Sequence, residues 1–374
     1  MLREKTRELM PSQDNGGVPF ALFAGMKMLT TLLLFAIATA ALAQQPAGKS
    51  AIASGRTAAV VSEVVAAQVM LDRAGFSPGE IDGQAGDNLK RAATAFQRST
   101  KLTESGQVDQ QTWERLADVT GRQPPLVEYQ IRDADVAGPF TPSIPADLVE
   151  QSKLDTLGYQ TPLEAIAERF HASPQLLQGL NPGQAFSAAG QTILVPNVNP
   201  FELPQPAPTD KQSLGRGQGV RRRPVGTSGT SGRSVTEPGF TIAVTKSTSA
   251  LTVEDAGGRV VFHAPVTTGS EHDPLPIGMW KVTEVFLMPP FHYNPDLFWD
   301  ANPSHSKVKI ASGPNNPVGV AWIDLTKEHY GIHGTPQPSR IGHVQSHGCV
   351  RLTNWDAQRL LQWAQPGTTV VFRE

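Results

Sequence analysis

Two short glycine-rich stretches lie near the C-terminal end of the chain: Gly331-Ile332-His333-Gly334-Thr335-Pro336 and Ser346-His347-Gly348-Cys349-Val350-Arg351. They contain the only cysteine of the 374 residues, together with two histidines. A thiol with an ordinary pKa of about 8.5 needs a nearby base to attack an amide at neutral pH. The pattern therefore predicts a nucleophilic cysteine served by a histidine, in preference to a buried cysteine that only fills space.

The residues around Cys349 are of types that could assist a nucleophilic thiol. His347 precedes Cys349 by two residues, and this spacing in an extended chain places both side chains on one face. His333 would have to reach the thiol across strands, and spacing alone does not choose between the two histidines. Gly348 allows a close approach of the backbone, so N–H groups around it could form an oxyanion hole. Arg351 could hold a carboxylate or make a surface ion pair.

The composition is that of a globular protein with two or three domains, because 39% of the residues are hydrophobic and 18% are charged. The formal net charge of −2 argues against a nucleic-acid partner. The 34 glycines and 31 prolines indicate many turns, short strands and a linker.

Residues 1–43 predict an export signal. The run from Met28 to Ala43, MLTTLLLFAIATAALA, follows Lys27 and ends in a small-x-small cleavage site. It is about sixteen residues long, whereas a membrane-spanning helix needs about twenty, so a cleaved signal peptide is favoured over an anchor. Residues 1–25 are polar and unlike the start of a signal peptide, which makes Met26 a candidate start of translation.

Residues 58–120 predict a small module of three helices, with Asp109 as the cap of the third helix. The stretch resembles the peptidoglycan-binding domain type 1 family. The resemblance is carried by Leu71, Gly75-Phe76, Pro78-Gly79, Ile81-Asp82-Gly83, Gly86, Ala95-Phe96-Gln97, Gly106, Val108-Asp109, Thr112-Trp113 and Leu116. It implies a module that binds cell-wall polymer. A spacer that binds nothing is the alternative, because small folds host many functions.

Residues 155–197 predict a second, α/β module. An amphipathic helix follows Thr161-Pro162, a second helix follows Ser173, and a short strand ends at Pro196. The stretch resembles a LysM glycan-binding module, although the usual first strand is weak. Residues 198–238, rich in Pro, Gly, Ser and Arg, predict a flexible linker.

Residues 239–374 predict a mostly antiparallel β domain, either a sandwich or a partly closed barrel, with one C-terminal helix. Short alternating apolar runs indicate the strands. Thr353 is the expected cap of the helix, with Asp356 three residues later. The whole chain is thus predicted to be a multidomain α+β protein. The strands are expected at 241–244, 250–253, 260–262, 280–285, 320–325, 330–333 and 368–372.

The C-terminal domain resembles the L,D-transpeptidase (YkuD-type) catalytic family. The matching residues are His333-Gly334-Thr335, Ser346 to Arg351, Pro276-x-Gly278, Gly313-Pro314-Asn315-Asn316-Pro317-x-Gly319 and Leu352-Thr353-Asn354. The resemblance implies that Cys349 is the nucleophile and His333 its proton acceptor and donor, oriented by a backbone carbonyl at Gly334. It implies oxyanion donors from His347, Gly348 and Cys349, and places Ser346 at a position that the family fills with Ser or Thr. Thr335 and Arg351 are expected to contact substrate.

The activity implied by this resemblance is transfer of a peptidoglycan stem. Cys349 would attack a tetrapeptide stem, release D-Ala and form a thioester, and an amine of a neighbouring stem would accept the acyl group in a 3→3 cross-link. No metal or cofactor is implied. The expected partners are stem peptides and glycan, with β-lactams of the carbapenem type as inhibitors. An exported protein of this kind is expected in the periplasm, associated with the wall.

Several alternatives stay open. Water as acceptor would give an L,D-carboxypeptidase, and a lipoprotein amine would give a transferase that attaches lipoprotein to the wall. A non-catalytic wall-binding protein needs only the two front modules. A metal hydrolase using His333, His343, His347 and Cys349 is disfavoured, because no carboxylate for a second shell lies within residues 331–351. Residues 289–294 and Phe298-Trp299 are expected to form a loop that covers the site.

Overall fold

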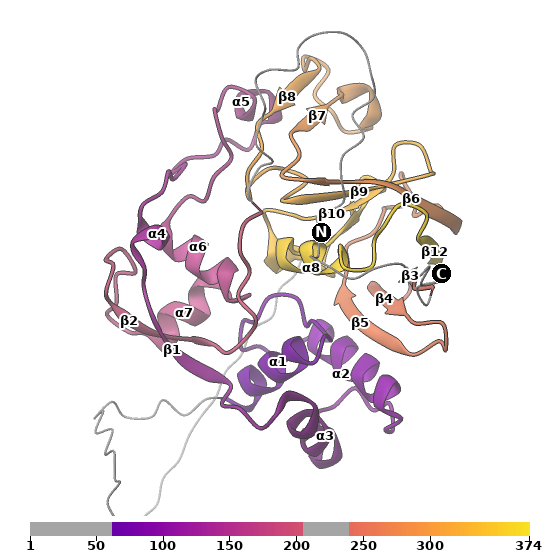
Figure 1. Ribbon diagram of the computed structural model, residues 1–374. Coiled ribbons are helices and arrows are strands. Elements are labelled where there is room, and N and C mark those ends of the chain that lie inside the picture. The colour runs from indigo at the N-terminus through magenta and orange to yellow at the C-terminus, as the bar shows by residue number, and fades with distance from the viewer. Residues whose placement is uncertain (1–61, 205–238) are drawn as a thin grey trace, which may run out of the picture. The chain divides into compact units, whose positions relative to one another are not determined.

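A curled sheet of eight strands forms the C-terminal domain in the computed structural model, which describes residues 62–204 and 239–374 (Figure 1). The strand order is β11-β10-β9-β6-β12-β3-β4-β5. The β10–β11 and β12–β3 pairs are parallel, and the other five pairs are antiparallel, as expected of a mostly antiparallel domain. The strands are β3 (Thr241–Thr245), β4 (Ala250–Glu254), β5 (Val260–Pro265), β6 (Gly278–Leu287), β9 (Ala321–Leu325), β10 (Gly331–His333), β11 (Val350–Arg351) and β12 (Thr369–Arg373).

The two ends of this strand order meet. Thr267, just after β5, exchanges two backbone hydrogen bonds with Arg351 of β11, at 3.1 Å and 2.9 Å. Gly269 forms a further bridge with Ser346. The sheet therefore curls far enough to bring the segment after β5 beside the cysteine-bearing strand.

Helix α8 (Asn354–Leu360) packs against β9 and β10. Thr353 begins the helix as predicted, because its hydroxyl accepts a hydrogen bond from the Asp356 N–H at 3.2 Å. Trp355, Ala357 and Leu360 are buried in the same hydrophobic core as the inward-facing residues of the sheet.

Three helices form the N-terminal part of the described chain: α1 (Glu63–Arg73), α2 (Asp87–Thr100) and α3 (Gln110–Thr120). Asp109 caps α3, as predicted, by accepting from the Thr112 N–H at 2.9 Å. Leu71, Phe96 and Leu116 are buried between the helices. The turns between them match the glycine-rich stretches of the sequence.

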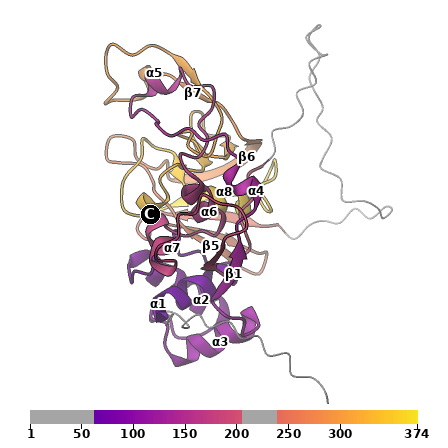
Figure 2. The same ribbon diagram turned by 90° about the vertical axis from the view of Figure 1, so that its left-hand side faces the viewer.

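The second module has a strand that lies outside the predicted range of 155–197. Strand β1 (Leu126–Gln130) pairs antiparallel with β2 (Thr192–Pro196). Four helices lie between these strands: α4 (Asp133–Val136), α5 (Leu148–Gln151), α6 (Pro162–Arg169) and α7 (Pro174–Leu180). Val65, Val69 and Ile81 of the first module belong to the hydrophobic core of the second. Figure 2 shows the same contact in the backbone, where α1 lies beside α7 and β1.

The first residues of the predicted linker are part of the folded protein. Val198 packs in the core of the second module, and Phe201 is buried in the core of the eight-stranded sheet. The Phe201 N–H also donates to the Arg169 carbonyl at 2.7 Å. The linker was predicted to begin at residue 198 because of its prolines, but these apolar side chains find partners. Residues 205–238 of the predicted linker, and residues 1–43 of the predicted signal peptide, lie outside the described residues.

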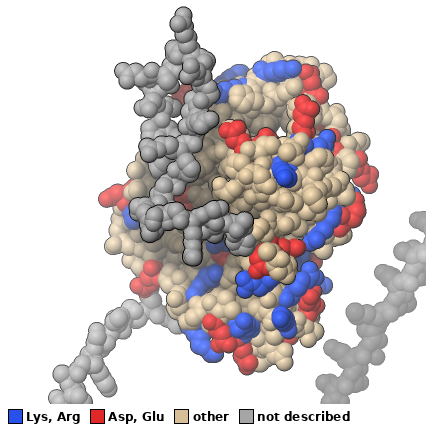
Figure 3. Space-filling model, turned by 45° about the vertical axis from the view of Figure 1, so that its right-hand side comes forward, with Lys and Arg blue, Asp and Glu red and all other residues tan. Residues whose placement is uncertain are grey.

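Within the described residues, no helix is long and apolar enough to cross a bilayer. On the face drawn in Figure 3, basic and acidic side chains are interspersed, in keeping with a formal net charge near zero.

A buried ion pair joins α8 to the N-terminal helices. Arg359 donates two hydrogen bonds to the carboxylate of Asp72, at 3.0 Å and 2.8 Å. His171 lies 3.1 Å from the same carboxylate and stacks on Trp355 at a centroid distance of 5.1 Å. The Asp72 side chain is fully buried, and Arg359 and His171 hold the pKa of its carboxyl well below its usual range although burial opposes them. The described residues, 62–204 and 239–374, accordingly belong to one compact unit.

We expect Asp72→Asn to lower the free energy of unfolding by about 3 kcal/mol, because it leaves the Arg359 guanidinium buried without its counter-ion. Urea denaturation followed by tryptophan fluorescence would measure the change. The matched control is Glu104→Gln, which breaks the exposed pair between Arg98 and Glu104 and should cost less than about 1 kcal/mol. Equal effects of the two substitutions would contradict the prediction.

Candidate active site

Three neighbouring strands bring the predicted residues to one face of the sheet. His333 on β10 stands opposite Arg351 on β11 and opposite Trp322 on β9. Side chains alternate across a strand, so Cys349, two residues before Arg351, belongs to the same face. Ile323, Ile332 and Val350, which alternate with these residues, are buried in the core. The alternation of apolar and polar residues thus separates core from site.

His333 is held in one orientation and one tautomer. Its Nδ1 lies 2.7 Å from the carbonyl oxygen of Gly334, the contact that the family resemblance implies. A carbonyl oxygen only accepts, so Nδ1 carries the proton and Nε2 is left with its lone pair. The ring stacks on Trp322 at a centroid distance of 5.3 Å and an interplanar angle of 16°. Burial, and then the charge of Arg351, lower the pKa of His333 to about 3.

Cys349 is half-buried, and its Sγ lies 3.8 Å from the carbonyl oxygen of His329. Burial raises the pKa of the thiol above its ordinary value, and the Gly331 N–H and the Arg351 charge oppose that rise. At neutral pH the resting site therefore holds a neutral thiol and a neutral imidazole. Ser346 fixes the turn before the cysteine, because its hydroxyl donates to the Cys349 carbonyl at 2.6 Å.

Gly348 has a backbone conformation that favours glycine. Its φ is +104°, and an added Cβ would lie 2.9 Å from the Tyr330 ring. In the part of the chain that the structure describes, the N–H groups of His347 and Gly348 donate no hydrogen bond to the protein. They remain available for an oxyanion.

Arg351 lies in the groove without a counter-ion. Among the described residues it forms no ion pair, and its buried Nε has no hydrogen-bond partner. Burial lowers its pKa, and the neighbouring Cys349 opposes this. Thr335 is buried at the groove wall, where its hydroxyl accepts from the Gln337 N–H at 3.3 Å. A buried cation without a partner is suited to a ligand carboxylate.

His347 engages a loop of the groove wall. Its Nε2 lies 2.8 Å from Asp300 Oδ1, and its ring packs edge-on against Phe298. This loop lies between β7 (Phe291–Tyr293) and β8 (Val308–Ile310), and includes the short 3₁₀ turn Pro295–Leu297. Trp299 in the same loop stacks on His272 at 4.2 Å. The structure thus directs His347 toward the loop and places His333 opposite Arg351.

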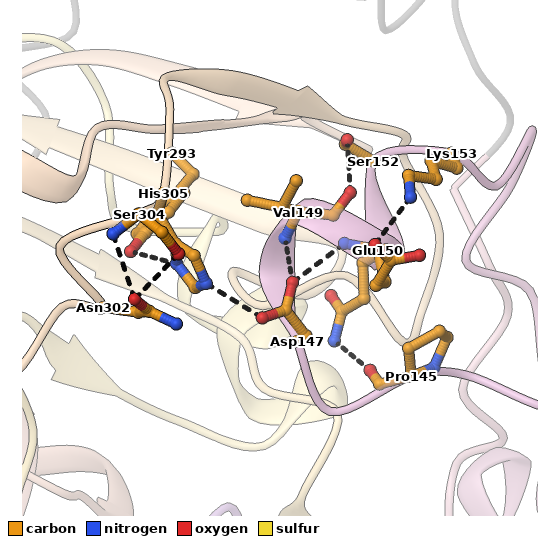
Figure 4. Close-up of polar contacts among 11 residues, drawn as sticks. Pro145, Asp147, Val149, Glu150, Ser152, Lys153, Tyr293, Asn302, Ser304 and His305 are labelled. Carbon is orange, nitrogen blue, oxygen red and sulfur yellow. Dashed lines mark hydrogen bonds and ion pairs between the residues drawn. The ribbon is translucent and has the colours of Figure 1, made fainter.

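A groove of about 960 Å³ contains Cys349, His333, His347, Thr335 and Arg351. Its far wall comes from the second module: Asp147 Oδ2 lies 2.9 Å from His305 Nε2, whose Nδ1 lies 3.1 Å from the Tyr293 hydroxyl (Figure 4). The volume lies in the range of small-molecule and peptide sites. His343 lines a different cavity, between the first and second modules and Pro338–Ser339, so the four residues of the metal-site alternative are not brought together.

Two family models match the chain. Residues 239–372 match the model described as "L,D-transpeptidase catalytic domain", and residues 61–116 match one described as "Putative peptidoglycan binding domain". Residues 239–372 are thus similar to the catalytic domain of L,D-transpeptidases. The second module, predicted to resemble LysM, has no counterpart in these two matches and stays a prediction.

Curated relatives carry the same family name. The "Putative L,D-transpeptidase YkuD" of Bacillus licheniformis is 28% identical over 213 residues, which is 56% of this chain and 91% of the relative. Its namesake from Bacillus subtilis is 26% identical over 210 residues, with the same coverage. The "Probable L,D-transpeptidase YbiS" of Escherichia coli strain K12 is 41% identical over 63 residues, 17% of this chain and 20% of the relative.

Solved structures of L,D-transpeptidases are also similar. L,D-transpeptidase 3 of Mycobacterium tuberculosis, in complex with a faropenem-derived adduct, is 17% identical with a TM-score of 0.31, over 37% of this chain and 61% of that one. An L,D-transpeptidase from Mycobacterium smegmatis is 16% identical with a TM-score of 0.30, over 37% and 59%. The chain thus spans about three fifths of the length of these solved relatives.

The structure adds residues to the candidate site that the sequence did not indicate. Trp322 stacks on His333, and Asp300 contacts His347. Asp147 enters the wall from the second module. Trp322 falls in a predicted strand and could have been assigned to the groove face by alternation. The other two come from irregular segments that carry no periodic signal.

We expect alkylation of Cys349 by iodoacetamide to rise with pH through one inflection, above the ordinary value of a thiol. Burial raises the pKa of the thiol, and the pKa of His333 is about 3, so the imidazole is neutral throughout pH 5–8. Intact-mass measurement of alkylation rates from pH 5 to 10 would test this. A fast, pH-independent rate between pH 5 and 7 would show a thiolate–imidazolium pair and refute it.

We expect Arg351→Gln to move this alkylation curve to higher pH, because the Arg351 charge lowers the pKa of the Cys349 thiol. The same assay at pH 7 should show slower alkylation of the variant. Arg373→Gln is the control, since Arg373 lies on β12, pairs with Glu254 and is outside the groove lining. An alkylation curve of Arg351→Gln that coincides with the wild-type curve would contradict the prediction.

Proposed function

We propose that the protein is a peptidoglycan L,D-transpeptidase that uses Cys349 as a covalent nucleophile. One observation carries this proposal: the only thiol of the chain shares a groove with an imidazole whose Nδ1 proton is committed to a backbone carbonyl. That arrangement leaves Nε2 of His333 as a base of the correct tautomer. The family of residues 239–372 supplies the reaction class.

In the first step, His333 Nε2 takes the thiol proton as Cys349 Sγ attacks the carbonyl that precedes the terminal D-Ala of a tetrapeptide stem. A neutral pair suits this step, because the proton moves only when the attack develops charge. Free N–H groups at His347 and Gly348 would stabilise the oxyanion. The C–N bond to D-Ala then breaks, the leaving amine takes the proton from His333, and a thioester remains on Cys349.

In the second step, an amine of a neighbouring stem attacks the thioester and regenerates the thiol, which gives a 3→3 cross-link. Arg351, a buried cation without a counter-ion, would hold a stem carboxylate, and Thr335 would contact substrate at the groove wall. Water as acceptor would make the enzyme an L,D-carboxypeptidase, and a lipoprotein amine would make it a wall-attachment enzyme. The reaction requires no cofactor or metal.

The two front modules would hold the enzyme on its polymer. Residues 61–116 match a peptidoglycan-binding model, and the strand-helix-helix-strand elements β1, α6, α7 and β2 would form a LysM-like glycan-binding module. Such binding raises the local concentration of stems. We propose that the protein is exported, works in the periplasm at the wall, and is acylated by carbapenem-type β-lactams.

We expect purified wild-type protein to generate 3→3 cross-linked dimers in isolated sacculi, and Cys349→Ala to generate none. His333→Gln should lower the rate by about 10²- to 10⁴-fold, the usual share of a general base. Muramidase digestion and mass spectrometry would count dimers, shortened tripeptides and lipoprotein-bound stems. Tripeptides without dimers would indicate the carboxypeptidase.

The controls separate the remaining alternatives. Activity that survives EDTA and is lost to iodoacetamide is the expected result, and the reverse would favour the metal hydrolase. If the Cys349→Ala variant changes the wall as the wild type does, the protein would be a non-catalytic wall-binding protein. Arg373→Gln should match the wild type in all of these assays, since it lies outside the groove lining.

A further inference from the structure

The second module forms hydrogen bonds with the loop that precedes β9. The Leu157 N–H donates to the Ser312 carbonyl at 3.2 Å, and the Asn315 N–H donates to the Leu157 carbonyl at 2.9 Å. The Asn315 side chain donates to Glu164 at 2.8 Å. An added Cβ at Gly313 would lie 2.0 Å from the Leu157 carbonyl oxygen, so only glycine allows this approach. The loop is therefore fixed by a segment outside the catalytic domain.

A second contact reaches the start of α8. Asn354 Nδ2 donates to Glu168 Oε1 at 2.7 Å and to the Pro314 carbonyl at 3.1 Å. Asn354 Oδ1 accepts from the Val320 N–H at 3.1 Å. Asn354 is completely buried, so each of these partners replaces water. Among residues 62–204 and 239–374, Glu168 is the one side-chain partner of this amide, and it comes from α6 of the second module.

The Asn354 amide packs directly against the backbone that orients His333. An added Cβ at Gly334 would lie 2.2 Å from Asn354 Oδ1, and one at Gly319 would lie 2.0 Å from it. The Gly334 carbonyl in turn lies 2.7 Å from His333 Nδ1. A shift of the Asn354 amide would therefore move the Gly334 peptide and, with it, the imidazole.

We propose that Glu168, in the second module, is a positioning residue for His333, acting through Asn354 and the backbone of Gly334. The role rests on the proposed function, since it presupposes that His333 is the base. It makes the second module a part of the catalytic apparatus as well as a wall-binding element. In the chain of contacts, Glu168 touches neither substrate nor reacting atoms.

Glu168 acts as a neutral hydrogen-bond acceptor. Burial raises the pKa of its carboxyl to about 8, and the nearby Glu164 and Glu80 add to the rise, while hydrogen bonds with Asn354 and Tyr159 oppose it. Arg169 faces Tyr159 in the same cluster. Below pH 8 the protonated acid and a glutamine amide offer Asn354 the same carbonyl acceptor. Above pH 8 the carboxylate still offers Asn354 an oxygen acceptor, since the Asn354 hydrogen bond favours the charged form of Glu168.

The test measures the rate at which a carbapenem acylates Cys349, by intact mass, in wild type, Glu168→Gln and Glu168→Ala. At pH 7 we expect Glu168→Gln to stay within about twofold of wild type and Glu168→Ala to lose at least about tenfold, because a displacement of about 1 Å can cost about 100-fold. The ratio of the Glu168→Gln rate to the wild-type rate should stay constant from pH 6 to 9, because the acid, the carboxylate and the amide all offer Asn354 an oxygen acceptor. This ratio cancels the titration of Cys349 itself.

The control is Asp72→Asn, which weakens another part of the same interface without touching Asn354. Below its unfolding transition it should be acylated at the wild-type rate. Glu168→Ala at the wild-type rate, Glu168→Gln as slow as Glu168→Ala, or a ratio that changes between pH 6 and 9 would each overturn the inference. If Glu168→Ala does not fold, Glu168→Met, which keeps the volume and offers no oxygen acceptor, takes its place. A wild-type protein that is never acylated would instead count against the proposed function.

Discussion

Helix α8 is the element on which the other parts of the structure converge, and polar side chains make its outer contacts. Arg359 binds Asp72 of the first module, and Asn354 binds Glu168 of the second. Asp356, on the same helix, accepts from the Ser77 hydroxyl at 2.7 Å. Buried charges and amides tolerate few alternative arrangements, because each lost partner leaves an unsolvated group. The polar face of α8 therefore fixes the position of the modules against the eight-stranded sheet. An apolar face would allow the modules to slide along the helix.

The same constraint of burial determines the chemistry of the site. Burial lowers the pKa of His333 and raises that of Cys349, so the pair rests neutral, and the Arg351 charge adds to the lowering at His333. A neutral imidazole with its Nδ1 proton held by Gly334 can only act as a base through Nε2. Under the proposed function, the nucleophile would form only when substrate arrives. A resting thiolate outside the reducing interior of a cell would be open to oxidation.

The sequence was informative wherever function depends on adjacent residues. Cys349, its flanking Ser346 and Gly348, and the cap Thr353 could be placed from short motifs, because their contacts are local. The alternation through β9, β10 and β11 also marks the groove face. Strand β1 was not predicted, because Leu126–Gln130 has five residues with a glutamate in the middle and pairs with a strand more than sixty residues away. Strands β7 and β8 have three residues each, which is too short to give a periodic pattern.

Contacts between modules carried no signal in the sequence for a different reason. Asp72 and Arg359 are 287 positions apart, and Glu168 and Asn354 are 186 apart, so no motif or period can relate them. A proline- and glycine-rich linker suggested modules that move independently of the enzyme. Yet Phe201, Asp72 and Glu168 all contact the catalytic domain or its helix. A ligand that shifts the second module would move Glu168 and therefore Asn354. Binding to the wall and the proposed catalysis would then be coupled through this contact.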